Sequence, residues 1–374
     1  LNFDAGGWGW QKRIDDDGSW GPVDTINNVQ LQPNVEYDIR IRYVGNEYTL
    51  WVDGEKVIDS TLSLTNEAGK FGIRNWFTSN RKVILKDIVF KEYEEPALPD
   101  PNPVVEQTIE SKAMRVVLDN NYPRVLRYEW KEDGSVLFGQ EAYIHTIALG
   151  GDEYFIDHAE VEPVGSDQLD YTLYVQDRLR EEGALPDGET AEIRAVIDVS
   201  MKVEDNKLHM EVTDIDERIG EVSTIEFVNN YYATVKDNGT AGGTFVRTTG
   251  NWHELNEEQF NLQDKEADGT KTPASYGTIY DGEFAISVEN NAINTGTLLH
   301  YAVSMSNGTK ILGLGDGIYT YRHQTAANSE WADKWDVEAL PKSTVVIGKD
   351  QNGDGIADWQ DGAILLRDIL DVPF

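Results

Sequence analysis

The feature that most constrains the fold is a long succession of short segments in which apolar and polar residues alternate. Segments such as Tyr37–Tyr43 and Lys207–Asp214 are separated by turn residues, and helical periodicity is rare before residue 349. Alternation with a period of two places one set of side chains on a buried face and the other in solvent, which is typical of antiparallel strands. The chain is therefore predicted to be all-β.

The strands are predicted to form a large two-sheet sandwich between residues 104 and 348. Asp205-Asn206 is expected to form a hairpin turn, and no repeat of 20–50 residues suggests a propeller or solenoid. The predicted strands are Ala113–Asp119, Arg124–Trp130, Tyr143–Leu149, Leu169–Arg178, Glu192–Val203, Lys207–Asp214, Ile225–Phe227, Gly277–Asp281, Phe284–Glu289, Leu298–Met305 and Thr344–Ile347.

The first 93 residues are predicted to form a separate, smaller β-domain. Tyr48–Val52 is followed by the turn Asp53-Gly54 and by Lys56–Asp59, and two further strands are expected at Gly69–Trp76 and Val83–Phe90. This order resembles the C-terminal half of concanavalin-like, laminin-G-type jelly rolls. Because the N-terminal strands of that fold are missing, the resemblance implies an incomplete sandwich.

A proline-rich stretch separates the two β-domains. Pro96, Pro99, Pro101 and Pro103 alternate with acidic residues, a composition typical of an extended linker. We therefore expect a domain at residues 1–93, a linker at 94–103, the large sandwich at 104–348 and a final segment at 349–374.

Composition excludes several classes of partner. The formal net charge is −35, with 67 acidic residues, so phosphate backbones and anionic membranes would be repelled. No apolar run reaches the roughly 20 residues that a membrane helix requires.

Cysteine is absent, which rules out disulfides and thiolate metal sites. Leu1 is not an initiator Met, and we expect the chain to begin within a longer precursor.

An acidic loop near the end of the chain has the spacing of a calcium-binding EF-hand loop. With Asp350 as position one, side-chain oxygens fall at positions one, three, five, nine and twelve, position seven offers a backbone carbonyl, and Gly355 occupies position six. The predicted Ca²⁺ ligands are Asp350, Asn352, Asp354, Ile356 through its carbonyl, Asp358 and Asp361. The alternative is a solvated acidic turn.

The loop departs from the EF-hand pattern at its last position. Asp361 stands where an EF-hand has a bidentate Glu, and its shorter side chain predicts weaker binding. Apolar residues at Ala363, Ile364 to Leu366, Ile369 and Leu370 then follow with helical spacing, so a short helix is expected after the loop.

The segment Asp350 to Arg367, "DQNGDGIADWQDGAILLR", resembles the one that introduces the catalytic barrel in endo-α-N-acetylgalactosaminidases, glycoside hydrolase family 101. Residues 104–348 are then similar to the galactose-mutarotase-like β-supersandwich of that family. The resemblance implies an extracellular or cell-surface bacterial enzyme that releases Galβ1-3GalNAc from Ser/Thr of mucin-type glycoproteins. The catalytic barrel would lie outside this chain. We therefore expect a non-catalytic region that packs on the barrel and helps to present glycoprotein, and no catalytic residue is assigned.

Two other functions stay open. The same acidic segment is similar to one repeat of a dockerin, a calcium-dependent module that binds a scaffold protein, although dockerins carry two repeats. The other is a stand-alone sugar-binding or mutarotase-like protein, and a mutarotase would need a His and a Glu in acid–base roles. His158 or His300 could take the first role, but no spacing selects a partner.

The remaining motifs favour structural interpretations. Gly313-Leu314-Gly315-Asp316-Gly317 lacks the Lys-Ser/Thr of a phosphate loop and is interpreted as a turn. The six histidines show no metal-ligand spacing. Tryptophans 8, 10 and 20 are expected in the core, and Trp252, Trp331 and Trp335 at a packing surface rather than as sugar platforms.

Overall fold

The computed structural model divides the chain into two compact units, Leu1–Glu95 and Pro96–Phe374, which are described separately. In the second unit the structure describes residues 102–185, 189–248, 255–263, 271–274, 276–290, 299–317, 319–320 and 340–370, with residues 98 and 99. In the first unit it describes residues 2–4, 7–13, 20–26, 35–44, 47–52, 55–61, 86, 88 and 89.

In the described part of the N-terminal unit there are two three-stranded antiparallel sheets. One joins β1 (Asn2–Asp4), β2 (Gly7–Arg13) and β3 (Trp20–Ile26), and the other joins β4 (Ile39–Val44), β5 (Glu47–Val52) and β6 (Glu55–Thr61). The predicted strands at 37–43, 48–52 and 56–59 are confirmed as β4 to β6. The strand predicted at 69–76 lies outside the described residues. Of residues 83–90 only 86, 88 and 89 are described, and these three are not in a strand. The jelly-roll assignment stays a prediction.

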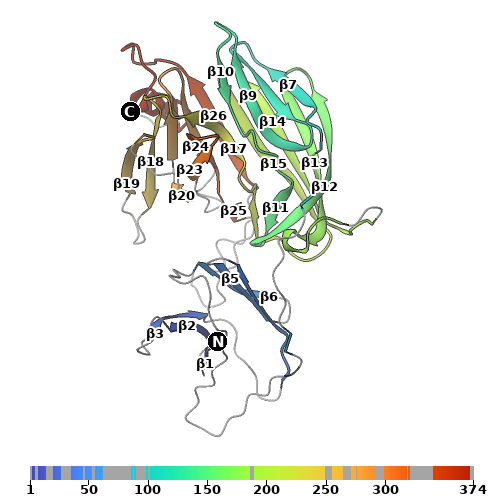
Figure 1. Ribbon diagram of the computed structural model, residues 1–374. Coiled ribbons are helices and arrows are strands. Elements are labelled where there is room, and N and C mark those ends of the chain that lie inside the picture. Colours follow the sequence, from blue (N-terminus) through green and yellow to red (C-terminus); the bar gives the residue numbers. More distant parts are fainter. Residues whose placement is uncertain are drawn as a thin grey trace, which may run out of the picture. The chain divides into compact units, whose positions relative to one another are not determined.

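The second unit is a sandwich of two antiparallel sheets (Figure 1). The first has eight described strands, in the order β20 (Lys271–Ala274), β23 (Leu299–Ser306), β24 (Thr309–Asp316), β17 (Tyr231–Lys236), β10 (Val136–Phe138), β9 (Tyr122–Trp130), β8 (Met114–Asp119) and β7 (Glu106–Glu110).

Within the described residues the second sheet has twelve strands, and the last of these strands along the chain lies in its middle. Its order is β19 (Leu255–Asn261), β18 (Gly242–Thr248), β21 (Tyr276–Tyr280), β22 (Ala285–Asn290), β26 (Lys342–Gly348), β15 (Lys207–Glu217), β14 (Ile193–Glu204), β13 (Gln168–Leu179), β12 (Asp152–Val164), β11 (Thr146–Leu149), β16 (Thr224–Glu226) and β25 (Tyr319–Thr320). A 3-10 turn, η1 (Arg180–Glu182), follows β13.

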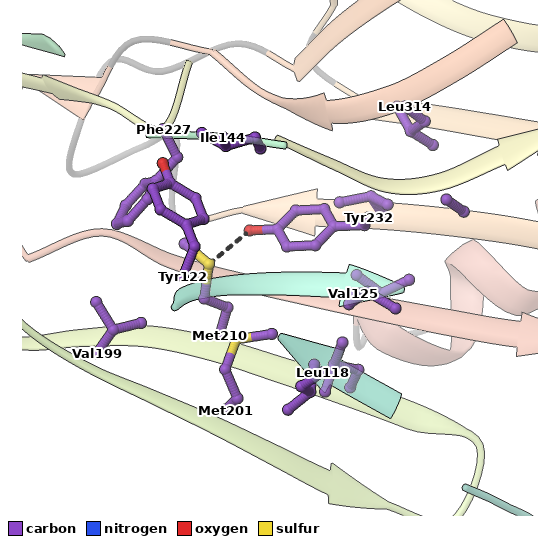
Figure 2. Close-up of a cluster of buried hydrophobic side chains, with 14 of the residues drawn as sticks. Leu118, Tyr122, Val125, Ile144, Val199, Met201, Met210, Phe227, Tyr232 and Leu314 are labelled. Atoms are coloured by element: carbon purple, nitrogen blue, oxygen red, sulfur yellow. Dashed lines mark hydrogen bonds between the residues drawn. The ribbon is translucent and has the colours of Figure 1, made fainter. Parts of the chain in front are cut away.

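The inner faces of the two sheets form one hydrophobic core. Tyr122 meets Phe227 edge-on, with ring centroids 6.1 Å apart, and the Tyr232 hydroxyl lies 3.2 Å from the Met210 sulfur (Figure 2). These side chains are at most 2% exposed. Alternating strands therefore bury their apolar faces as the sequence predicts, and the all-β, two-sheet expectation is confirmed.

Each of the eleven strands predicted in this unit occurs, with ends that differ by a few residues. The hairpin at Asp205-Asn206 is also confirmed, since Asp205 joins β14 to β15 with a φ of 48°. The strand β12 was missed because register shifts between Tyr154 and His158 break its alternation.

One interpretation of the sequence was wrong. Gly313 to Asp316 lie inside β24, between β17 and β23, and do not form a turn. The glycines are needed there for close approach: a Cβ on Gly315 would lie 2.3 Å from the carbonyl oxygen of Asn230.

A buried carboxylate joins the two sheets. Asp316 of β24 is 6% exposed and accepts hydrogen bonds from Tyr232 of β17, from Ser343 of β26 at 2.5 Å and from Asn290 of β22 at 3.3 Å. The Tyr319 hydroxyl is 2.7 Å from Ser343 Oγ. Burial raises the pKa of Asp316, and the hydroxyl donors partly offset this rise.

The helix α2 (Trp359–Leu370) covers β21, β22 and β26, and confirms the helix expected after the acidic loop. It packs closely because residue 362 is glycine: a Cβ there would lie 1.9 Å from Thr278 Cγ2. The Ser287 hydroxyl donates to the Gly362 carbonyl at 2.7 Å. Ala357, in the loop, forms an antiparallel bridge with Gly282.

An ion pair is also buried. Arg124 and Asp119 are each 1% exposed and form a salt bridge, and Arg124 also donates to the carbonyl of Ala142. The Tyr171 hydroxyl donates to the Asp119 carbonyl at 2.8 Å. These contacts fix the segment that follows β10 against β8 and β9.

We expect Arg124→Met to lower the free energy of unfolding by about 3–5 kcal/mol, because it leaves the Asp119 carboxylate buried without its cation. Arg127→Met is the matched control: Arg127 pairs with Glu106 at 2.7 Å, where half of the Glu106 side chain is exposed, so the loss should stay within about 1 kcal/mol. Urea unfolding followed by circular dichroism measures both, and equal losses would contradict the assignment.

Candidate functional site

Of the two histidines considered for acid–base roles, His300 has a glutamate beside it. His300 lies on β23, and its Nδ1 is 3.7 Å from Oε1 of Glu226, the last residue of β16. The side chains are 16% and 15% exposed. The fold thus brings together an imidazole from the eight-stranded sheet and a carboxylate from the twelve-stranded sheet.

The strand register explains how Tyr231 joins this pair. His300 is the direct partner of Gly315, and Gly315 is the direct partner of Tyr231. Directly opposed residues of antiparallel strands point to the same face. His300 and Tyr231 therefore flank a position that has no side chain, while Glu226 precedes Tyr231 by a short connection.

The Tyr231 ring is largely enclosed and stays protonated at ordinary pH. Burial, together with the negative charge of Glu226, raises the pKa of Tyr231 to about 12. The pair is thus bordered by a neutral phenol, which adds no further charge beside the carboxylate.

A second glutamate lies on the same face of the twelve-stranded sheet. Ala148 of β11 pairs with Glu226 on one side and with Glu153 of β12 on the other. Glu153 accepts hydrogen bonds from Arg180 at 2.9 Å and from Thr146 at 3.1 Å. Arg180 offsets the charge of Glu153.

His145 is held in an aromatic stack close to this second glutamate. Its ring is 5.4 Å from that of Tyr143 and 5.7 Å from that of Phe155, with interplanar angles of 19° and 22°. Burial, and secondly the charge of Arg180, lowers the pKa of His145. The imidazole is therefore neutral at physiological pH.

The other candidates are placed elsewhere. His158 is half exposed, its Nδ1 is hydrogen-bonded to Asp157 Oδ2 at 2.6 Å, and its ring stacks on that of Tyr174 with centroids 4.3 Å apart. His209 contacts the Thr344 hydroxyl at 3.2 Å. His253, His323, Trp252, Trp331 and Trp335 lie outside the described residues.

In the acidic loop, the carboxylates at its first and last positions accept hydrogen bonds from the backbone. Asp350 accepts N–H groups of Gly353 at 2.6 Å and Gly355 at 2.8 Å, and these interactions lower the pKa of Asp350. Asp361 is fully buried and accepts the N–H groups of Gln351 at 2.6 Å and Asp358 at 2.8 Å. Both carboxylates therefore hold the loop in its curled form.

The intermediate positions of the loop lie at its surface. Asn352 and Asp354 are exposed, and their Nδ2 and Oδ2 atoms are 3.1 Å apart. Asp358 accepts the N–H of Gln360 at 2.7 Å, and Ile356 is exposed. Among the residues described, no three His, Cys, Asp or Glu side chains are grouped as they would be around a metal ion. The donors are all oxygen, which is the chemistry that Ca²⁺ prefers.

None of the described helices is long and apolar enough to cross a membrane.

Comparison with known proteins gives the family. Solved structures similar to this chain include a galactose mutarotase related enzyme from Lactobacillus acidophilus, with 10% identity, 68% of this chain and 100% of that chain covered, and a TM-score of 0.37. A galactose mutarotase-like protein from Lactobacillus casei has 10% identity, coverage of 65% and 100%, and a TM-score of 0.35. The galactosidase domain of an α-galactosidase–sucrose kinase has 8% identity, coverage of 67% and 40%, and a TM-score of 0.34. The family model of the galactose mutarotase-like fold domain matches residues 109–359, and the chain therefore belongs to this family.

Proposed function

We propose that this chain is the carbohydrate-presenting, non-catalytic region of an extracellular bacterial endo-α-N-acetylgalactosaminidase that acts on core-1 O-glycans of mucin-type glycoproteins. Membership of a carbohydrate-related family supports the sugar-handling part of this proposal. The resemblance of residues 350–367 to the segment before the barrel in glycoside hydrolase family 101 supports the parent enzyme. In this proposal the sandwich packs against that barrel, which belongs to another part of the parent enzyme.

The Glu226–His300 pair is the observation that carries the sugar-binding role. A carboxylate accepts hydrogen bonds from sugar hydroxyls, and an imidazole can donate or accept one. Both side chains are about five-sixths enclosed, so their hydrogen bonds to a ligand would be less weakened by water than those at an open surface. The pair therefore offers complementary polar groups to two neighbouring hydroxyls.

The same geometry favours one second function, which is anomer exchange of an aldose. Glu226 as a base would take the proton of the C1 hydroxyl while the bond from C1 to the ring oxygen breaks and a C1 carbonyl forms. His300 as an acid would give its proton to the ring oxygen. Rotation of the aldehyde and the reverse steps would complete the exchange.

The acidic loop is proposed as a calcium site at the junction of β26 and α2. Asp350, Asn352, Asp354, Asp358 and Asp361 would supply side-chain oxygens, with the carbonyl of Ile356. Gly353 and Gly355, with φ of 84° and 96°, permit the turns that such a loop needs. A bound cation would neutralise part of the negative charge gathered here.

We expect the chain to bind Galβ1-3GalNAc and galactose, and we expect Glu226→Gln and His300→Asn each to weaken binding about tenfold through loss of one charged or polar contact. Isothermal titration calorimetry measures the affinities. His158→Asn is the matched control, because His158 is exposed and paired with Asp157.

Two activity measurements separate the candidate functions. The chain alone should release no disaccharide from asialo-mucin, and polarimetry should show no faster exchange of galactose anomers if presentation is its role. Exchange that is accelerated by the chain and lost in Glu226→Gln would support the second function. Absence of sugar binding by the unaltered chain would refute both.

We expect Ca²⁺ to bind after chelation with a dissociation constant of about 10⁻⁴–10⁻³ M, the range of extracellular calcium modules, and to raise the unfolding temperature. Asp350→Asn combined with Asp354→Asn should abolish the rise, whereas Asp368→Asn, exposed on α2, should not. Calorimetry and thermal unfolding provide the readouts. No binding at millimolar Ca²⁺ would rule out the site.

A further inference from the structure

The Tyr231 ring lies face-on over Gly313. A Cβ placed on Gly313 would be 2.7 Å from Cγ of Tyr231, and 2.9 and 3.0 Å from its Cδ1 and Cδ2. If this Cβ lay in the plane of the ring, it would be much farther from both Cδ atoms than from Cγ. The three distances are nearly equal, so residue 313 lies over one face of the ring. Any side chain at residue 313 would displace the Tyr231 ring.

Gly313 is held in the surface of the sheet because strands pair with it on both sides. Gly313 pairs with Thr234 of β17 and with Ala302 of β23, and Ala302 is 6% exposed. One face of the Tyr231 ring is thus closed by the sheet, while the residue as a whole remains partly accessible to solvent. Since the sheet closes the face toward Gly313, a ligand could contact only the opposite face of the ring.

This ring borders the Glu226–His300 pair. Tyr231 and His300 are the two direct neighbours of Gly315, and the charge of Glu226 acts on the Tyr231 hydroxyl. An aromatic face next to a carboxylate and an imidazole combines an apolar surface with hydrogen-bonding groups, which is the combination a pyranose requires.

Resting on the proposed sugar-binding role of the pair, we infer that Tyr231 is the stacking residue of the site and receives the apolar face of a galacto-configured pyranose. The axial 4-hydroxyl of galactose leaves the hydrogens on C3, C4 and C5 together on one face of the ring. Those hydrogens carry partial positive charge and are attracted to the negative face of an aromatic ring. Glucose, whose 4-hydroxyl is equatorial, lacks this continuous patch on one face.

The hydroxyls at the rim of the sugar would then meet Glu226 and His300. The phenol is neutral, so stacking introduces no second negative charge beside Glu226. Tyr231 binds and orients the pyranose ring of the sugar, and it takes no part in proton transfer.

The test compares three variants of the full chain with methyl β-D-galactopyranoside and methyl β-D-glucopyranoside as probes. Tyr231→Leu removes the aromatic face and should weaken galactoside binding about tenfold, whereas Tyr231→Phe should stay within about threefold of the unaltered protein. Gly313→Ala should also weaken binding, because it lifts the ring. Preference for the galactoside over the glucoside should fall with Tyr231→Leu.

Proton NMR supplies a readout that a merely structural role would not change. Stacking shifts H3, H4 and H5 of the bound galactoside upfield through the ring current, in the unaltered protein and in Tyr231→Phe. Absence of these shifts in both proteins overturns the inference, even if Tyr231→Leu fails to fold. Sugar binding that needs Glu226 and His300 but is unchanged in Tyr231→Leu overturns the inference alone, whereas no binding by the unaltered chain overturns the proposed function with it.

Discussion

The two sheets of the larger unit depend on a carboxylate that is almost wholly removed from water. A buried carboxyl group without hydrogen-bond donors is costly, so Asp316 imposes positions on Tyr232, Ser343 and Asn290, which come from three other strands. Apolar contacts allow small slips between stacked sheets, whereas this set of hydrogen bonds does not. The hydrogen bonds of Asp316 therefore fix where β24 crosses the strands of the opposite sheet.

The position of the candidate site follows from that crossing. Since Asp316 points into the sandwich, the preceding residue, Gly315, points to the other side of the sheet. Its two neighbours there, His300 and Tyr231, are placed by backbone pairing and not by a flexible loop. A fold does not by itself determine an activity, so function must be argued from these side chains and not from the sandwich itself.

Sequence reasoning located most strands but could not locate the site. Segments such as Glu192–Val203 alternate at all but one position, so their local pattern is sufficient, as it was for the helix after the acidic loop. Glu226 and His300 belong to strands of different sheets, and no local spacing records that they meet. The strand β24 was missed for a related reason. Gly313 and Gly315 are glycines because a side chain there would collide with Tyr231 or Asn230, which are distant in sequence. Glycines considered alone suggest a turn. The ligand role of the calcium loop stays a prediction.

The place of β26 has a consequence for how the protein is made. This strand pairs with β15 on one side and β22 on the other, so Lys207 lies opposite Val346, and residues late in the chain complete the middle of the twelve-stranded sheet. During synthesis, β15 and β22 must leave the ribosome long before their shared neighbour, with the edges that β26 will cover still unpaired. The twelve-stranded sheet can therefore be completed only after β26 has been made, its folding should be slow, and a chain interrupted before residue 342 would leave two partial sheets that are prone to aggregate.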